Sequence, residues 1–276
     1  MSIITLISDF GLKDHYVGIL KGKIYSQYPE VNIVDLSHEV AKFNLFDASY
    51  LLEASYYHFP KGTVHIMAVD AAQTSDTVHI AILLDGHYFI GADNGVLGHL
   101  AQKINPEKMV QINIHDRLSG VVNDLDVFAA VGAHLAKGGA LTVIGKEVEE
   151  IKPLYRLHVT VDEQLQFLKG HVVYIDDFGN CVTNITKKQI DEVAKGRKPL
   201  VRFHNKKIDS VKKNYTDFKK NDVISLKTHE GNAIAIINEA GFLEIAIYKS
   251  NPDSIGSAAS LLGLRFRDLV TVEFEN

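Results

Sequence analysis

Acidic residues stand where the predicted strands of the first half end. Asp9 follows the apolar run 3–8, and Asp35 and Asp70 close two later runs. Ligands of an open α/β sheet bind at the carboxyl ends of its strands. A carboxylate there can accept hydrogen bonds from a diol such as ribose O2′ and O3′. The alternative is that each aspartate caps the helix after it, and we favour capping for Asp35 because Ser37 follows closely.

Four further residues suit the other parts of a nucleoside-like ligand. Asp14, five residues after Asp9, can meet a ligand ammonium, or simply lie at the positive end of a helix dipole. Phe43 follows a polar loop and can stack on a nucleoside, although a core position is the alternative. Phe178 can lie on a base, and the amide of Asn180 can bind adenine through a paired donor and acceptor. The alternative for both is a hairpin turn with a packed aromatic ring.

Several other chemistries are excluded by spacing. Asp-Phe-Gly occurs at residues 9–11 and 177–179, but a kinase needs a glycine-rich loop and a strand lysine well upstream of that triplet. The chain has no G-x-G-x-x-G after its first strand and no G-x-S-x-G elbow. Its 13 histidines lack metal-ligand spacing, and its one cysteine excludes a multi-cysteine site. We therefore expect no metal and no cofactor.

The composition predicts a folded protein with an acidic balance. The chain has 276 residues, 46% of them hydrophobic, and a net charge of −5. This charge argues against a nucleic-acid protein, and the basic stretch 195–220 is interpreted as a solvated face. No apolar run approaches the roughly 20 residues that a bilayer requires, and no signal-like segment opens the chain. A single cysteine fits a reducing compartment, so we expect a cytoplasmic protein without a membrane partner.

Strands and helices alternate in the first half. This order predicts an α/β domain over residues 1–160, with a mostly parallel sheet and helices on both of its faces. A turn at Asp85-Gly86 predicts one hairpin. The expected strands are 3–8, 31–36, 63–70, 79–84 and 87–90, and the expected helices are 16–28, 46–57 and 127–136.

Short β-like runs separated by Gly, Asn and Asp fill the second half. They predict a small antiparallel β-barrel over residues 161–276, reached through a linker at 152–166. The expected strands are 172–175, 182–185, 200–203, 223–226, 233–237, 243–247 and 269–274.

Ten pieces of the chain, in order, carry a family resemblance. They are residues 5–11, 14, 16–18, 33–39, 59–70, 92–95, 174–180, 183–185, 241–246 and 262–264. The ordered set resembles the S-adenosyl-L-methionine (SAM) hydroxide adenosyltransferases, which are related to the fluorinases and chlorinases. The resemblance implies an enzyme that makes adenosine and L-methionine from SAM by displacement at C5′.

The resemblance also implies a homotrimer, with each site between the first domain of one subunit and the second domain of its neighbour. Asp9 would hold the ribose diol, and Asp14 with Asp176 the methionine ammonium. Phe43 would line the ribose pocket. The adenine would lie at Phe178 and Asn180, closed by the backbone near Ile247 and Lys249.

The sequence departs from the family where water would be activated. Asp70 matches a family Asp, but the Pro-Gly-Val-Gly and paired Arg that follow are replaced by residues 71–78, which hold no Arg. The family's Phe-His-Gly-Arg-Asp corresponds to residues 122–126, so the His becomes Asn123 and only Asp126 survives. Asn123 can orient a water but cannot take its proton.

The base therefore stays open between Asp70 alone and a substitute such as His79. Slow hydrolysis is the favoured function, with Asp70 and Asn123 as the catalytic pair. The alternatives are a non-catalytic adenosine or SAM binder and a halide-using transferase.

Overall fold

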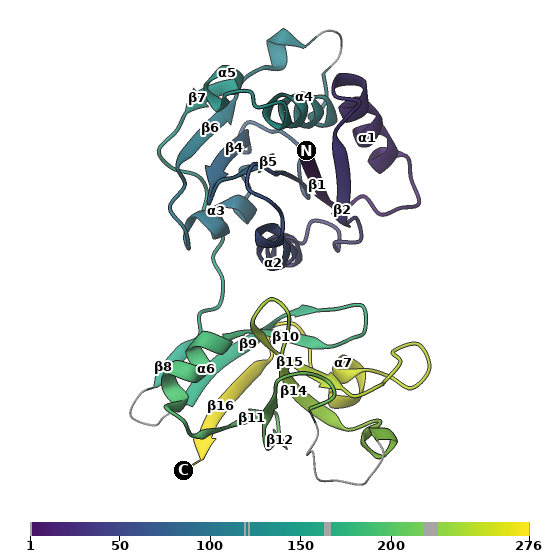
Figure 1. The fold of residues 1–276 in the computed structure, drawn as a ribbon, viewed down its shortest axis with the longest axis vertical. Coiled ribbons are helices and arrows are strands. Elements are labelled where there is room, and N and C mark those ends of the chain that lie inside the picture. The colour runs from purple at the N-terminus through teal and green to yellow at the C-terminus, as the bar shows by residue number, and fades with distance from the viewer. Residues whose placement is uncertain (1, 119, 121, 163–166, 218–225, 276) are drawn as a thin grey trace. The chain divides into compact units, whose positions relative to one another are not determined.

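The computed structural model describes residues 2–118, 120, 122–162, 167–217 and 226–275 (Figure 1). The chain divides into two compact units, Met1–Tyr155 and Arg156–Asn276. The division lies close to the boundary expected at residue 160.

The first unit is built on a seven-stranded sheet. Its order is β2 (Asn32–Ser37), β1 (Ile3–Ser8), β3 (Val64–Ala68), β5 (His87–Ala92), β4 (His79–Leu84), β6 (Lys108–Ile112) and β7 (Gly145–Glu147). The first four strands in this order are parallel, and the other three are each antiparallel to their neighbours. The sheet reverses at the predicted hairpin, where Asp85 and Gly86 have φ angles of 49° and 69°.

Helices cover both faces of this sheet, as expected for an α/β domain (Figure 1). On one face α1 (Tyr16–Gln27) packs against α4 (Asp124–Ala136), and on the other α2 (Leu45–Ser55) packs against α3 (Val96–Ala101). A short helix, α5 (Leu141–Ile144), follows α4. Strand β1 alternates between the two cores, because Ile4 and Leu6 join one cluster and Ile7 joins the other.

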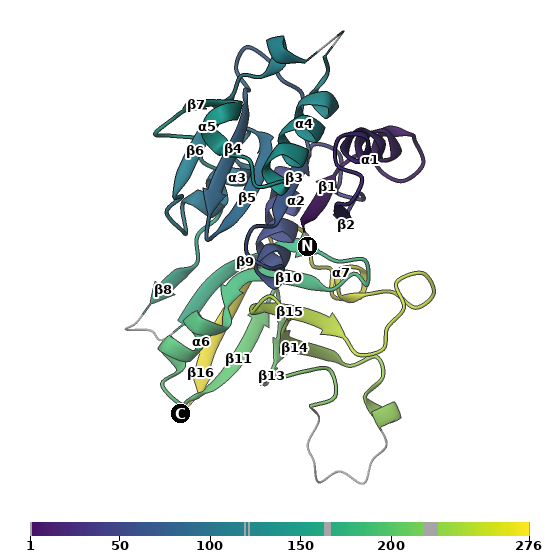
Figure 2. The same ribbon diagram turned by 45° about the horizontal axis from the view of Figure 1, so that its top comes forward.

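The second unit is a nearly closed β-barrel, as predicted, and its sheet curls round in Figures 1 and 2. Among the described strands of this unit, every pairing is antiparallel except that of β13 with β14. The order is β12 (Lys206–Ile208), β11 (Lys198–Phe203), β16 (Leu269–Glu275), β9 (Phe167–Ile175), β10 (Cys181–Thr186), β15 (Phe242–Ile247), β14 (Ala233–Ile237) and β13 (Val211–Lys212), with β8 (Thr160–Asp162) beside β9.

The second unit differs from the sequence analysis in several details, and its short strands β12 and β13 are among the elements not predicted. The expected linker 152–166 contains a strand, because β8 pairs with β9. Two helices, α6 (Lys187–Ala194) and α7 (Ala258–Leu262), were not predicted. The expected strand 223–226 lies outside the described residues except for Leu226, which begins a 3-10 helix, Leu226–His229. Within unit 1, two further 3-10 helices are Tyr56–His58 and His115–Arg117.

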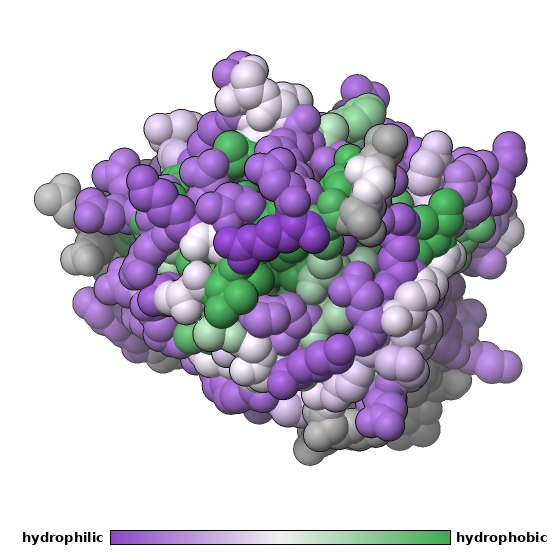
Figure 3. Space-filling model, turned by 90° about the horizontal axis from the view of Figure 1, so that it is seen from above, coloured by the Kyte–Doolittle hydropathy of each residue, from purple (hydrophilic) through white to green (hydrophobic). Residues whose placement is uncertain are grey.

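One face of the molecule is mostly hydrophilic. Hydrophilic residues dominate the face in Figure 3, and apolar side chains show there only in small groups. Across the described ranges, no helix is both long enough and apolar enough to cross a membrane.

Two histidines are buried in the sheet of the first unit. His65 on β3 has its Nδ1 2.7 Å from the Thr5 hydroxyl and its Nε2 3.3 Å from Nδ1 of His87. Its ring stacks on Phe89 with centroids 4.9 Å apart. Burial lowers the pKa of His65 to about 3 and also lowers the pKa of His87. Both rings are therefore neutral in the folded protein at neutral pH.

We expect these histidines to make the fold sensitive to acid. An unfolded histidine gains a proton near pH 6.5, whereas folded His65 does so only near pH 3. The contribution of neutral His65 to the free energy of unfolding is complete above pH 6.5. It decreases as the pH falls toward 3, by about 1.4 kcal/mol per pH unit. Urea unfolding between pH 7 and 4 should show a shallower pH dependence for His65→Gln. The exposed His58 supplies the control His58→Gln, and an unchanged slope in His65→Gln would contradict the assignment.

Candidate active site

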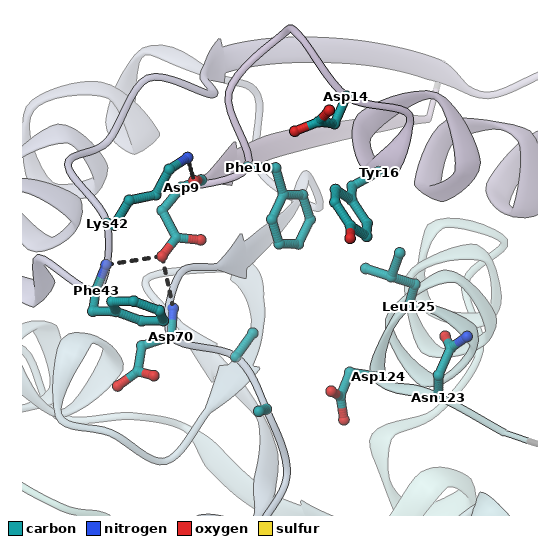
Figure 4. Close-up of a pocket in the computed structure, with 12 residues that line it drawn as sticks. Asp9, Phe10, Asp14, Tyr16, Lys42, Phe43, Asp70, Asn123, Asp124 and Leu125 are labelled. Carbon is teal, nitrogen blue, oxygen red and sulfur yellow. Dashed lines mark hydrogen bonds between the residues drawn. The ribbon is translucent and has the colours of Figure 1, made fainter.

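A pocket of about 540 Å³ lies in the first unit, at the carboxyl ends of β1 and β3 (Figure 4). The first residues of α1 and α4 form its other walls. Its lining residues are Asp9, Phe10, Asp14, Tyr16, Lys42, Phe43, Asp70, Ala71, Ala72, Asn123, Asp124 and Leu125. This position is the one expected for a ligand of an open α/β sheet. The pocket brings together five predicted site residues, namely Asp9, Asp14, Phe43, Asp70 and Asn123.

Asp9 is the most firmly held of these side chains. It is buried, and its Oδ2 accepts hydrogen bonds from the backbone N–H of Phe43 at 2.9 Å and of Asp70 at 3.5 Å. The Lys42 ammonium donates to the backbone carbonyl of Asp9. In Figure 4 the other carboxylate oxygen points toward the middle of the pocket. Asp9 therefore presents one oriented acceptor to a ligand and uses the other to hold two loops.

The two residues whose backbone N–H groups donate to the Asp9 carboxylate, Phe43 and Asp70, have strained backbones. Phe43 has a φ of 60° and Asp70 a φ of 44°, in the left-handed region where a non-glycine residue costs roughly 1–2 kcal/mol. Asn94 holds the second of these turns, because its Nδ2 donates to the carbonyls of Val69 and Asp70 at 3.0 and 3.1 Å. Strain of this kind is concentrated at functional sites. The Asp93-Asn94-Gly95 turn therefore serves the pocket indirectly.

Phe43 is a surface residue and not part of the core. Its side chain is 71% exposed, and it lines the pocket. The alternative of a core aromatic is therefore wrong, because the left-handed turn at this residue directs the ring outward. An exposed ring beside an oriented carboxylate provides a stacking surface.

Asn123 has a structural task as well as a place in the pocket. It is the N-cap of α4, where its Oδ1 accepts from the N–H of Asp126 and its own N–H donates to Asp126 Oδ2, both at 3.1 Å. Asp126 also pairs with Lys23 of α1. The amide oxygen of Asn123 is thus committed to the helix, and the amide nitrogen remains for a ligand or a water.

The sequence analysis did not identify Asp124, which stands beside Asn123 in the pocket wall. Its Oδ1 accepts from the N–H of Gln73 at 3.2 Å and lies 3.4 Å from Nε2 of His79. That Nε2 is also 2.9 Å from the carbonyl of Ala71. The expected helix began only at residue 127, whereas α4 begins at Asp124, so the sequence pattern provided no reason to place Asp124 in the pocket wall beside the buried His79.

His79 does not take the place of a catalytic base. It is fully buried and is not among the lining residues. Burial lowers the pKa of His79, and its Nε2 is used on the carbonyl of Ala71. His79 therefore supports the segment 71–73 from behind.

The pocket is strongly acidic. Four carboxylates line it, from Asp9, Asp14, Asp70 and Asp124, against a single lysine, Lys42. Such a charge attracts a cation and disfavours an anion. The lining therefore suits a positively charged ligand with a diol.

The other predicted residues lie in the second unit, around the turn between β9 and β10. Both oxygens of Asp176 accept from Asn180, one from its backbone N–H at 2.7 Å and one from its Nδ2 at 2.9 Å. Phe178, at the tip, is 69% exposed. The alternative of a packed aromatic is therefore wrong for Phe178, because its turn projects the ring into solvent.

Ile247 is the last residue of β15, the strand next to β10, and Lys249 lies two residues beyond it. Cys181 pairs with Ile245 in this ladder, so the chain leaving β15 runs beside the turn of Asn180. Ile247 is buried, and its carbonyl accepts from the N–H of Ser250 at 3.3 Å. Lys249 has a left-handed φ of 50°, and its ammonium lies 3.2 Å from Glu230.

Two family models cover most of the chain. The model of the SAM hydroxide adenosyltransferase N-terminal domain matches residues 4–145, and that of the C-terminal domain matches residues 170–271. The chain belongs to the SAM hydroxide adenosyltransferase family. The division between the two models falls where the structure divides into its two units.

Named members of the family are similar along nearly the whole chain. An (R)-S-adenosyl-L-methionine hydrolase of Methanocaldococcus jannaschii is 31% identical over 99% of this chain and 96% of its own. An (R)-S-adenosyl-L-methionine hydrolase of Thermus thermophilus is 28% identical over 96% of this chain and 97% of its own. A fluorinase of Actinopolyspora mzabensis is 25% identical over 70% and 75%. A crystal structure of an uncharacterized conserved protein from Thermotoga maritima superposes with a TM-score of 0.83. It is 28% identical, and the match covers 98% of this chain and 99% of the other.

Two segments in which the sequence analysis expected departures from the family pattern line the pocket. Ala71 and Ala72 belong to the first of them, and Asn123, Asp124 and Leu125 belong to the second.

Gly179 allows the turn that carries Asn180. It has a φ of 71°, and a Cβ on it would lie 2.2 Å from the hydroxyl of Ser257. We expect Gly179→Ala to destabilise the unit by about 1–3 kcal/mol beyond the backbone strain, because Ser257 caps α7. Gly263 has a φ of 74° with open space around it, so Gly263→Ala reports the strain alone. Thermal unfolding of the two variants measures the difference. Equal losses of stability in Gly179→Ala and Gly263→Ala would contradict the steric clash with Ser257.

Proposed function

We propose that the protein hydrolyses SAM to adenosine and L-methionine. The oxygen of a water forms a bond to C5′, the C5′–S bond breaks, and its electron pair returns to sulfur. The water loses a proton to a base, for which Asp70 is our candidate. The leaving group is a neutral thioether, so neither a general acid nor a cofactor is required.

The observation that carries the proposal is the fixed carboxylate of Asp9 in an acidic pocket of this family. Asp9 offers an oriented oxygen to the ribose diol, and Phe43 an exposed ring for stacking. The sulfonium and ammonium of SAM are cations, which match the four lining carboxylates. Named SAM hydrolases are similar over nearly the whole chain. Catalysis then depends mainly on alignment and on removal of water around the nucleophile.

The acidic lining also favours water over halide as the nucleophile. A chloride or fluoride ion would approach four carboxylates and one lysine. The halide-using alternative therefore has less support here than hydrolysis. A non-catalytic nucleoside binder has one observation in its favour, which is the absence of the family's Arg and His from the pocket.

A direct assay distinguishes these functions. The protein is incubated with SAM at pH 7.5, with and without chloride, and adenosine and methionine are measured by chromatography against a blank without protein. Equal amounts of both products, unaffected by chloride, are the expected result. A 5′-chlorinated nucleoside would support the transferase. If calorimetry shows that adenosine binds but SAM is not turned over, the protein is a non-catalytic nucleoside binder and the proposal of hydrolysis is wrong.

We also propose a homotrimer with sites shared between subunits, acting in the cytoplasm. The ribose-facing group at Asp9 and the base-facing group at Asn180 belong to different units of the chain. The buried free thiol of Cys181 fits a reducing compartment. Light scattering during adenosine titration tests the assembly, and a strict monomer that binds adenosine tightly would contradict it.

A further inference from the structure

A chain of hydrogen bonds joins the buried Asn180 to the buried Glu244 in the barrel. The Nδ2 of Asn180 donates to Asp176 Oδ2 at 2.9 Å and to the hydroxyl of Tyr215 at 3.2 Å. The Tyr215 hydroxyl donates to Glu244 Oε1 at 2.5 Å, and the other oxygen of Glu244 accepts from Nδ2 of Asn238 at 3.3 Å. Asn180 is 7% exposed and Glu244 5%. Burial raises the pKa of Asp176, Tyr215 and Glu244.

The chemistry of these partners fixes which end of the Asn180 amide faces them. An ionised carboxylate only accepts hydrogen bonds, and the Tyr215 hydroxyl gives its one hydrogen to Glu244. Both therefore require the NH₂ end of Asn180, whose two hydrogens are thereby used. A rotated amide would place its oxygen against Asp176 Oδ2. Only the carbonyl oxygen of Asn180 is left to contact a ligand.

We infer that Tyr215, together with Asp176, makes the purine site selective for a 6-amino purine over a 6-oxo purine. The inference rests on the proposed function, in which Asn180 contacts the base. The paired donor and acceptor expected for Asn180 is reduced to a single acceptor. It accepts from the exocyclic amine of adenine and opposes the carbonyl of hypoxanthine. Tyr215 is a positioning residue, because it acts on the base through Asn180.

The wild-type protein tests the orientation of the amide without any substitution. Calorimetry is performed with adenosine, purine riboside, which has hydrogen at C6, and inosine. We expect affinity to fall in that order, with adenosine bound about tenfold or more tightly than inosine, since a buried acceptor opposite another acceptor is costly. Equal affinities for adenosine and inosine would overturn the inference and leave hydrolysis untouched. Binding of none of the three would overturn both proposals.

The variant Tyr215→Phe tests the role of the hydroxyl. It frees one hydrogen of the Asn180 amide while Asp176 still holds the other, so the preference for adenosine over inosine should decrease by about threefold or more. Tyr155→Phe, which removes a hydroxyl from an exposed ring, is the matched control. Near-ultraviolet circular dichroism establishes that each variant is folded. A folded Tyr215→Phe that loses affinity for both nucleosides equally would show a merely structural role and overturn the inference.

Discussion

Replacing Asp9 with alanine is expected to abolish adenosine binding. An ionised carboxylate makes charge-assisted hydrogen bonds to a diol, each contributing roughly 1.5–3 kcal/mol, so the loss of two raises Kd by about 100-fold or more. The loss extends beyond the ligand, since Asp9 also accepts from the N–H groups of Phe43 and Asp70. Calorimetry with adenosine measures the effect.

The variant Asp9→Asn separates the two tasks of this side chain. Its amide oxygen can still accept from the backbone of Phe43, but the charge at the diol is lost. We expect a smaller decrease in affinity than in Asp9→Ala, with nearly unchanged thermal stability. Asp85 is a suitable control, because it also directly follows a strand but lies outside the pocket. Adenosine binding by Asp9→Ala at the wild-type level would reduce Asp9 to a loop-holding residue.

Replacing Asp70 with asparagine is expected to slow single-turnover release of adenosine by about 10²–10⁴-fold, the usual contribution of a general base. Asparagine tolerates the left-handed backbone at this position, where φ is 44°. The variant should therefore keep its structure and its adenosine affinity. Rates are measured from pH 6 to 9. Equal rates for Asp70→Asn and the wild type would remove Asp70 from the mechanism.

The companion variant Asn123→His restores the family's residue and should raise the rate. The structure adds a cost, because Asn123 caps α4 and loss of a cap removes about 1 kcal/mol of stability. The matched control is Asn123→Ser, since serine also caps a helix but cannot take a proton at neutral pH. An equal increase in both variants would show that relief at the helix end, and not a base, changes the rate.

Local patterns determined most of the architecture. The run Ile3–Ser8 is buried on both faces because apolar side chains at successive positions fit only a central strand. The turn Asp85-Gly86 specified its hairpin because both residues tolerate left-handed angles. The helix Lys187–Ala194 was overlooked although its start is visible as Thr186 and Gln189, which form a capping box.

The sequence also determined the chemistry of one half of the pocket. Strand ends identified Asp9 and Asp70, because the sheet topology brings the carboxyl ends of parallel strands to one edge. Phe43 was predicted as a stacking ring from its place after a polar loop, and the family resemblance added Asn123 to the same site. These expectations depend on local sequence, because the spacing of residues along the chain predicts where each strand ends and therefore where its last residues lie in the sheet.

Only the tertiary structure decided what each side chain has left to offer a ligand. Nothing near Asn180 in sequence shows that the hydroxyl of Tyr215, 35 residues further along the chain, accepts from its amide. The closeness of His79 to Asp124 likewise joins residues that are far apart along the chain. Hydrogen bonds are satisfied between groups that folding brings together, and a buried donor or acceptor must be satisfied by whichever group lies beside it. A sequence names the groups, but the packing of distant segments determines their partners.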